Sequence, residues 1–363
     1  MQAFTNYHKV WRELIIPLFT ALIFSVLSIS TACCSATAQE NIKTHHTERE
    51  FKNLYLEEDH GFFQFLRWRW ERLWKDIPSG DSYEFPLAEN DPPFLRANRD
   101  NTTLTWIGHA TLLLQINGVN ILTDPQFSER ASPVQWAGPK RVVPPGIDLE
   151  ALPHIDIVII SHDHYDSLDT NTVKKLRSRT GGDKTSFFVP LGLKDWFQRI
   201  GINNVIEMDW WDEYQVDGLS IVATPMQHWG KRSPFTRNEH LWASWVIIDD
   251  GFRFYFGGDS GYSPHFQETG KRLGPFDLAA VPIGAYEPRW FMKNHHINPE
   301  EAVQAHKDLR SKKSVAIHWG TFMLTDEPLD EPPVKLKAAL LEQGVSEDMF
   351  LILKHGETIV LDY

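Results

Sequence analysis

The chain has almost no cysteine: its 363 residues contain only Cys33 and Cys34, both close to the start. If the N-terminal segment is removed, the mature protein can form no disulfide bond and has no thiolate to offer a metal ion. Any metal site in the remainder must therefore be built from histidine, aspartate and glutamate.

A run of basic residues is also missing. Acidic residues outnumber basic ones by 48 to 36, and the formal net charge is −12. Because nucleic-acid binding relies on clustered positive charge, we expect no nucleic-acid partner. Charged residues make up 23% of the chain and hydrophobic ones 42%, which is typical of a soluble globular fold.

Charge is absent from residues 14–39, which follow a short basic segment and end in the small residues ATA. The order of basic, apolar and small segments is typical of a secretory signal. It predicts an exported protein, either periplasmic or membrane-anchored, with residues 1–38 as a signal peptide or membrane anchor. Cleavage after Ala38, retention as an anchor and lipidation at Cys33 all stay open.

The segment 39–100 begins as a polar tether and continues with GFFQFLRWRWERLWKDIP, in which tryptophans alternate with arginines. Two interpretations compete for this Trp/Arg-rich segment. It is either an amphipathic helix lying at a membrane surface or a helix that packs its aromatic residues on the following domain. Residues 101–363 show no internal break and are interpreted as one catalytic domain.

From Thr103 onward, short apolar runs alternate with turn signals such as Asn117-Gly118. Helices are indicated at 170–178, capped by Asp169 or Thr170, and from Asn298 onward. Strands are predicted at 103–108, 110–116, 119–125, 155–160, 219–225, 242–249, 252–258, 277–284, 314–320 and 350–361. Because many neighbouring strands are joined as hairpins, this is a mixed α/β layout.

Residues that can bind a metal ion lie at the ends of four predicted strands: His162, His228, Asp259 and His318. Side chains collected from several strand ends are a common way to build a site in α/β folds. The motif SHDHYDSLD adds His164 and Asp166 within five residues of His162. Two imidazoles and a carboxylate packed so closely favour a bound cation, so the sequence predicts a metal centre.

Longer stretches around this motif resemble the N-acyl-phosphatidylethanolamine-hydrolysing phospholipase D family of the metallo-β-lactamase fold superfamily. They run from about residue 100 to the end and include WIGHAT (106–111), LTDPQFSERASPVQWAGPKR (122–141), SHDHYDSLD (161–169), GPFDLAAVPIGAYEPRWFMK (274–293) and KSVAIHWGTF (313–322). The resemblance implies an αβ/βα sandwich, in which two sheets lie face to face, helices cover them, and two zinc ions lie at one edge.

The resemblance also implies the ligands. One zinc ion would be held by His162, His164 and His228, the other by Asp166 and His318, and both by a bridging Asp259. The family has a histidine directly after the motif's aspartate, where this chain has Ser167. A hydroxyl is a poor zinc ligand, so we expect a second, weaker ion with three protein ligands and solvent. A mononuclear enzyme or a different second metal stays open.

The implied reaction is the phospholipase D-type hydrolysis of N-acyl-phosphatidylethanolamine-like membrane phospholipids to phosphatidic acid and an N-acylethanolamine. Two cations would lower the pKa of a shared water, so that hydroxide attacks phosphorus. Asp166, Asp259 and His296 are the expected catalytic residues, although His296 could equally serve only as a hydrogen-bonding residue of its loop. His109, Asp124 and Ser167 are expected to surround and orient the ligands.

Two other functions compete with this one. The same centre could hydrolyse another ester, a lactone or another phosphodiester, because this fold hosts many hydrolases. Alternatively, the chain could be a secreted binding protein with a vestigial metal site. A membrane surface is the expected partner, and a homodimer stays open.

Overall fold

The computed structural model describes residues 43–56, 61–233 and 235–361. Of the described residues, those from 48 to 361 belong to one compact unit and residues 43–47 belong to another. The predicted signal segment 1–38 lies outside the described residues. Over the described ranges, no helix is long and apolar enough to cross a membrane.

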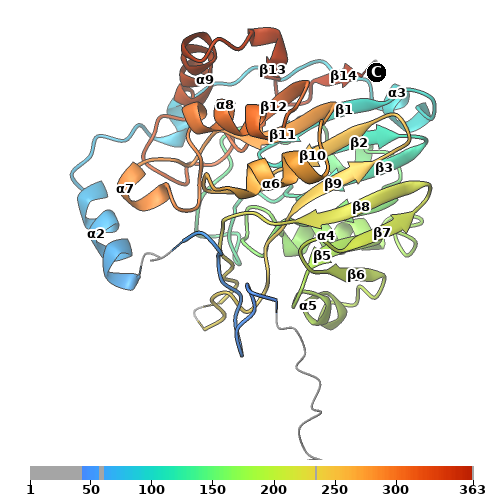
Figure 1. Cartoon of the computed structure of the whole chain (residues 1–363), viewed down its shortest axis with the longest axis horizontal. Helices are drawn as coiled ribbons and strands as arrows, with labels where there is room; N and C mark the ends of the chain where they lie inside the picture. The colour runs from blue at the N-terminus through green and yellow to red at the C-terminus, as the bar shows by residue number, and fades with distance from the viewer. Residues whose placement is uncertain (1–42, 57–60, 234, 362–363) are drawn as a thin grey trace, which may run out of the picture. The chain divides into compact units, whose positions relative to one another are not determined.

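Two seven-stranded mixed sheets are the framework of the described structure (Figure 1). The first has the order β14 (Thr358–Val360), β1 (Thr103–Gly108), β2 (Thr111–Ile116), β3 (Val119–Thr123), β4 (Ile157–Ile159), β5 (Ser186–Pro190), β6 (Val205–Met208). The second has the order β13 (Phe350–Leu351), β12 (Lys313–Ile317), β11 (Leu278–Pro282), β10 (Arg253–Phe256), β9 (Ser244–Ile248), β8 (Leu219–Thr224), β7 (Glu213–Val216).

Each sheet combines an antiparallel part with a parallel part. Strands β1, β2 and β3 pair antiparallel, whereas β3, β4, β5 and β6 pair parallel. The second sheet repeats this pattern, antiparallel from β7 to β10 and parallel from β10 to β13. The parallel parts bring the carboxyl ends of several strands to the same edge, which is where the predicted metal ligands follow.

The helices cover the sheets. They are α2 (Phe62–Arg72), α3 (Pro92–Ala97), α4 (Thr170–Ser178), α5 (Lys194–Arg199), α6 (His265–Arg272), α7 (Arg289–Met292), α8 (Pro299–Asp308) and α9 (Glu331–Glu342), with short 3₁₀ turns η1 (Gly80–Ser82), η2 (Leu149–Ala151) and η3 (Glu347–Met349). In Figure 1, α4 and α5 lie beside the first sheet, whereas α6 and α8 lie beside the second.

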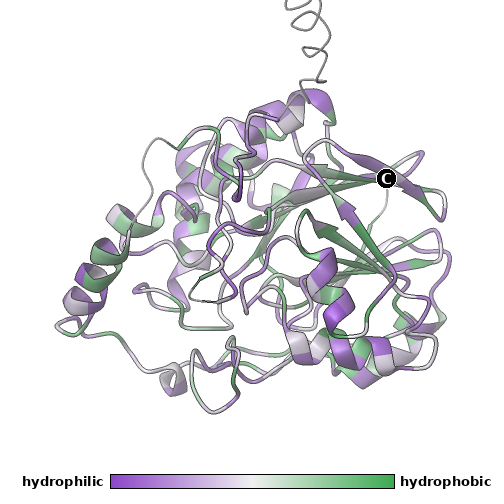
Figure 2. Ribbon diagram, turned by 90° about the horizontal axis from the view of Figure 1, so that it is seen from below, coloured by the Kyte–Doolittle hydropathy of each residue, from purple (hydrophilic) through white to green (hydrophobic). Residues whose placement is uncertain are grey.

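The core follows the alternation of strand side chains. Leu112 and Leu114 of β2 point toward the second sheet and join the cluster that contains Ile221 and Val246. Leu113, between them, joins the opposite cluster with residues of α4 and α5. Because successive residues of a strand face opposite sides, one strand supplies both layers. Figure 2 shows mainly hydrophobic strands inside and hydrophilic residues on the surrounding helices. This confirms the predicted α/β sandwich.

Most element predictions are confirmed. Asp169 caps α4 by accepting a hydrogen bond from Asn171, and Asn298 caps α8 in a capping box with Glu301. Asn117 and Gly118, both at positive φ, turn β2 into β3. Strands β5, β6 and β7 and helices α6 and α9 were not predicted from the sequence.

The predicted last strand, residues 350–361, is wrong as one element. Its first part is β13, which pairs with β12 of the second sheet, and its last part is β14, which pairs with β1 of the first. Between them Gly356 adopts φ +87°, a conformation that only glycine enters without strain. The two apolar ends resemble one strand in sequence because each is buried in a different sheet.

Candidate metal centre

Five of the predicted metal ligands follow directly from strand ends. His162 and His164 lie after β4, His228 after β8, Asp259 after β10, and His318 after β12. Asp166, the sixth predicted ligand, lies in the same loop after β4 as His162 and His164. The structure brings these side chains together into groups whose candidate ligand atoms lie within 4.8 Å of one another.

The first group is the three-histidine cluster, which consists of His162, His164 and His228. His164 Nδ1 lies 2.9 Å from His162 Nε2 and 3.2 Å from His228 Nε2. His162 and His228 are fully buried. Neutral imidazoles present one lone pair each, and three lone pairs converging at this spacing suit a tetrahedral zinc ion with imidazole ligands.

Outer hydrogen bonds set which nitrogen of each ring faces the centre. His162 Nδ1 lies 2.9 Å from Ser161 Oγ, and the same hydroxyl donates to the predicted orienting residue Asp124. His228 Nδ1 lies 3.0 Å from the carbonyl oxygen of His295. Since a carbonyl oxygen only accepts, His228 carries its proton on Nδ1 and leaves Nε2 free to bind a metal. The sequence analysis assigned no role to His295, because a backbone carbonyl has no sequence signal.

Asn53 fixes the backbone of His228 from a distant part of the chain. Its side-chain amide donates to the carbonyl oxygen of His228 at 2.7 Å and accepts from the same residue's N–H at 3.2 Å. This reciprocal pair mimics strand pairing and uses both polar groups of the His228 backbone. Asn53 lies in the segment that the sequence predicts to be a tether, so its role was not foreseen.

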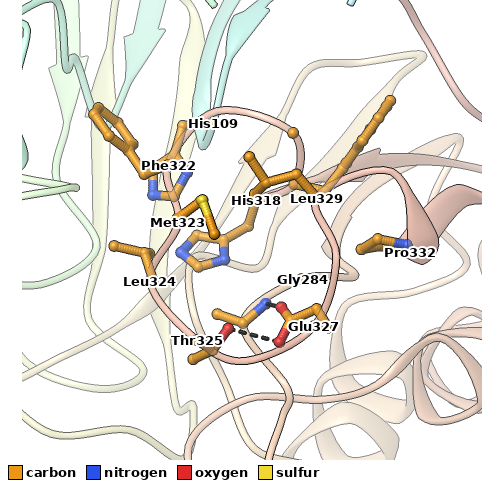
Figure 3. A pocket seen from close by; sticks show the side chains of 13 residues that line it. His109, Gly284, His318, Phe322, Met323, Leu324, Thr325, Glu327, Leu329 and Pro332 are labelled. Carbon is orange, nitrogen blue, oxygen red and sulfur yellow. Dashed lines mark hydrogen bonds between the residues drawn. The ribbon is translucent and has the colours of Figure 1, made fainter. Parts of the chain in front are cut away.

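The second group is the Asp166 cluster, which consists of His109, Asp166 and His318. His109 Nε2 lies 3.1 Å from Asp166 Oδ2, and His318 Nε2 lies 3.5 Å from the same oxygen. The rings of His109 and His318 are 4.1 Å apart between centroids. Figure 3 shows both rings beside a small cavity of about 10 Å³ that they line together with residues of the loop after β12.

Asp259 lies between the two clusters. Its Oδ2 atom is 3.0 Å from His318 Nε2 and 3.8 Å from His162 Nε2. The side chain is buried, yet neither carboxylate oxygen has a hydrogen-bond partner. Leaving a buried carboxylate without partners is costly, so the arrangement calls for a cation at this position. The residues present therefore fit a pair of metal ions.

The charges of the centre fall into two kinds. Burial and then neighbouring histidines lower the pKa of His164 to about 4 and that of His228 well below its usual value, so both rings are neutral at pH 7. Burial also lowers the pKa of His318, but Asp259 and Asp166 outweigh it and raise the value to about 10. Without a metal, a proton on His318 supplies the positive charge that the two carboxylates require.

His296 and Ser167 differ in their surroundings. His296 lies in a third group with His228 and Asp259, and its ring is 5.5 Å from that of His318. Burial lowers the pKa of His296 to about 3, so its ring is neutral. The Ser167 side chain is buried, and its hydroxyl has no hydrogen-bond partner.

Asp163, which lies between His162 and His164 in the motif, has a structural role. Its carboxylate lies 2.8 Å from His240 Nδ1 and accepts a hydrogen bond from the Lys231 backbone at 2.7 Å. It thereby anchors the loop that follows His228 to the loop that carries His162. Because its partners are about seventy residues downstream, the motif alone could not show this contact.

Gly258 allows the approach of Asp259 to the motif. A Cβ atom built on Gly258 would lie 2.6 Å from the Cβ of Ser161, and the residue has φ +59°. Any side chain here would push the loop after β10 away from the loop after β4. The glycine-rich sequence GGDSG is thus explained by close backbone approach.

Comparisons with known proteins identify the fold and the superfamily. Residues 119–319 match the model of the β-lactamase superfamily domain. Among solved structures, the metallo hydrolase Igni18 from Ignicoccus hospitalis shares the fold, with a TM-score of 0.55 and 22% identity over 73% of this chain and all of that one. The fold and the site therefore define a metal-dependent hydrolase of the metallo-β-lactamase superfamily.

Relatives that are similar in sequence identify the family within this superfamily. N-acyl-phosphatidylethanolamine-hydrolyzing phospholipase D 1 of Caenorhabditis elegans is 46% identical over 265 residues, which cover 70% of this chain and 74% of that protein. The mitochondrial protein of the same name from Saccharomyces cerevisiae is 36% identical and matches 71% of this chain and 56% of its own length. The chain belongs to the N-acyl-phosphatidylethanolamine-hydrolysing phospholipase D family.

Proposed function

We propose that the protein is a zinc-dependent phospholipase D-type phosphodiesterase that converts N-acyl-phosphatidylethanolamine-like lipids to phosphatidic acid and N-acylethanolamine. The proposal rests on the position of Asp259, whose carboxylate lies between the three-histidine cluster and the Asp166 cluster. The chain is also 46% identical to such a phospholipase. Paired metals of this kind suit phosphodiester hydrolysis, because they can stabilise both the attacking and the leaving oxygen.

In this proposal, His162, His164 and His228 would hold the first zinc ion. Asp166 and His318 would contribute to the second, and Asp259 would offer its carboxylate to both. When bound, the two ions supply Lewis acidity and lower the pKa of water near the phosphate.

The chain's own residues supply position and charge. The buried carboxylates of Asp166 and Asp259 would balance the positive charge of the ions. Burial raises the pKa of both, but His109 and His318 outweigh it at Asp166, and His318 and His162 outweigh it at Asp259, so both pKa values are lowered and both groups stay ionised at pH 7. Because His296 is neutral, it acts in this proposal as an N–H donor to a phosphate oxygen. Hydrolysis breaks the P–O bond on the head-group side, so that phosphate stays with the diacylglycerol part and the oxygen leaves with the N-acylethanolamine.

Helix α2 supports a substrate presented by a membrane surface. Trp68 anchors the helix: it is buried, stacks on Phe291 at 5.3 Å between centroids, and donates to Asp326. The other face of the helix and the turn that follows it expose large apolar side chains, with Phe63 on the helix 81% and Trp74 in the turn 76% exposed. Large aromatic residues next to arginines are typical of segments that lie at a lipid interface. With the predicted signal segment, this leads us to propose an exported, membrane-associated enzyme.

Assaying the purified protein against N-acyl-phosphatidylethanolamine vesicles and against a small soluble phosphodiester tests the reaction. We expect rapid release of N-acylethanolamine and phosphatidic acid from the vesicles. Turnover of the soluble phosphodiester alone would reject lipid specificity. No hydrolysis of either substrate after zinc addition would favour a binding protein.

The exposed face of α2 can be tested separately. Replacing Phe63 and Trp74 by serine is expected to raise the KM for vesicles about tenfold, because apolar area is lost from the lipid contact. Hydrolysis of a soluble phosphodiester should not change. Leu341→Ser is the matched control, since Leu341 is 85% exposed on α9. An unchanged KM in the double variant would contradict membrane contact through α2.

A further inference from the structure

The Asp166 cluster, which forms the second half of the centre, contains the imidazole of His109, which does not come from the motif SHDHYDSLD. His109 lies between β1 and β2, far from the motif in sequence, and its side chain is buried. Its Nε2 atom points at the centre, 3.1 Å from Asp166 Oδ2, and shares the Asp166 cluster with His318.

Ser167, the residue that follows Asp166 in the motif, is not placed to act as a metal ligand. The Ser167 hydroxyl is buried without a hydrogen-bond partner, so no hydrogen bond links it to Asp166 or His318. A hydroxyl is also a weak zinc ligand beside imidazole. Of the other histidines near the centre, His296 groups with His228 and Asp259 rather than with Asp166.

We propose that His109 binds the second metal ion through Nε2 and so takes the ligand position that Ser167 cannot fill. This inference rests on the two-metal part of the proposed function. The donor set of the second ion is then His109, Asp166, His318 and Asp259. Zinc ligands at about 2.0–2.1 Å from a tetrahedral ion lie roughly 3.3 Å apart. The distances of His109 Nε2 and His318 Nε2 from Asp166 Oδ2, 3.1 and 3.5 Å, fall on either side of that spacing.

The backbone holds His109 and His318 as a pair. The N–H of His318 donates to the carbonyl oxygen of His109 at 2.9 Å, and Trp106 Nε1 donates to the same oxygen at 2.9 Å. The N–H of His109 donates to Thr321 Oγ1, which lies three residues after His318. Both histidines also adopt positive φ, +54° and +62°. Non-glycine residues in this region are uncommon and cluster at functional sites, where surrounding contacts maintain them.

A competing role is that His109 only donates a hydrogen bond from Nε2 to Asp166 and orients that carboxylate. The His109→Gln variant separates ligation from orientation, because the glutamine amide can donate a hydrogen bond to Asp166 but is a poor zinc ligand. The Ser167→His variant separates the two roles in a second way. It adds an imidazole next to Asp166, which could bind the metal in place of His109.

The test is to measure the zinc stoichiometry and the affinity of each ion for five proteins: wild type, His109→Ala, His109→Gln, His109→Ala with Ser167→His, and His306→Gln. The last is the matched control, because His306 is buried but bonds to Ser314, away from the centre. Cobalt substitution and its visible absorption spectrum report the coordination of each ion independently of activity, and circular dichroism confirms folding.

We expect two zinc ions in the wild type and the control. His109→Ala and His109→Gln should bind the second ion at least about a hundredfold more weakly, and Ser167→His should restore it in the alanine background. Wild-type affinity for the second ion in His109→Gln would overturn the inference in favour of the orienting role. A wild type with a single zinc ion would instead overturn the two-metal part of the proposed function, and the inference with it.

Discussion

The two halves of the metal centre are supported very differently. In the three-histidine cluster, His162 and His228 each have an outer hydrogen bond on the nitrogen that faces away from the centre, whereas the outer Nε2 atom of His164 has none. In the Asp166 cluster, the corresponding Nδ1 atoms of His109 and His318 have no hydrogen-bond partner. Since such outer contacts fix ring orientation and raise the basicity of the ligand, the first half should bind its metal more tightly.

The charges of the two halves also differ. The three-histidine cluster offers imidazoles, whereas the second half combines imidazoles with the carboxylates of Asp166 and Asp259. Because carboxylates attract a divalent cation, the weaker binding predicted for the second half rests on its missing outer hydrogen bonds.

The largest expected effect is that of Asp259→Asn, which removes the charge shared by both halves. We expect a loss of turnover greater than the about 10–100-fold typical of outer residues, together with loss of at least one zinc ion. Activity on N-acyl-phosphatidylethanolamine and metal content measure both effects. Normal zinc content would show that Asp259 does not join the halves.

Acid and alkali should destabilise the metal-free protein through different histidines. His164, His109 and His296 have folded pKa values of about 4, 4 and 3, below the usual value, so their contribution is complete above pH 6.5 and is lost as the pH falls toward 4. His318 has a pKa of about 10, so its contribution is complete below pH 6.5 and is lost as the pH rises toward 10. Each group accounts for at most about 1.4 kcal/mol per pH unit.

Urea unfolding of the metal-free protein at pH 5, 7 and 9 measures this dependence. The free energy of unfolding should be highest near neutral pH and fall more steeply on the acid side, where several histidines act together. In His318→Gln the alkaline decrease should become smaller. A stability that rises steadily from pH 5 to pH 9 would contradict the raised pKa of His318.

Asn53→Ala should have a smaller effect, confined to the first half. We expect zinc bound by the three-histidine cluster to dissociate about tenfold more readily, because the His228 backbone loses both side-chain contacts. Competition with a coloured chelator measures this affinity. Leu54→Ala, a change at the next residue, which is 39% exposed, is the control. Equal affinities in the two variants would show that Asn53 does not position His228.

Ser167→Ala should have the smallest effect of all. Removing a buried hydroxyl that has no partner costs no hydrogen bond, so turnover and zinc content should stay within about twofold of the wild type. Both quantities can be measured beside Asp259→Asn. Comparable losses in the two variants would show that Ser167 is a ligand or a catalytic group.

Much of the fold could be predicted because its patterns are local. The alternation of strand residues, the Asn117-Gly118 turn and the caps Asp169 and Asn298 are each written in a few consecutive residues. The segment 350–361 shows the limit. Its two apolar ends pair with strands of different sheets, so the interruption between them depends on the tertiary structure and has no local sequence signal.

The site shows the same limit. The HxHxD motif and the residues at strand ends indicated a metal centre, because those residue types need a cation when they are crowded together. The contacts of Asn53, the His295 carbonyl and Asp163 could not be predicted, since each joins segments far apart in the sequence. The approach of His109 Nε2 to Asp166 likewise depends on how the β1–β2 turn meets the loop after β4.

Stepwise return of zinc to the metal-free protein, with turnover of N-acyl-phosphatidylethanolamine measured at each step, tests the central claim most directly. We predict that the first equivalent binds tightly with little activity, that a second equivalent binds more weakly, and that turnover rises with the second. Full turnover at one zinc ion per chain, or two ions of equal affinity, would contradict a two-metal centre with unequal halves.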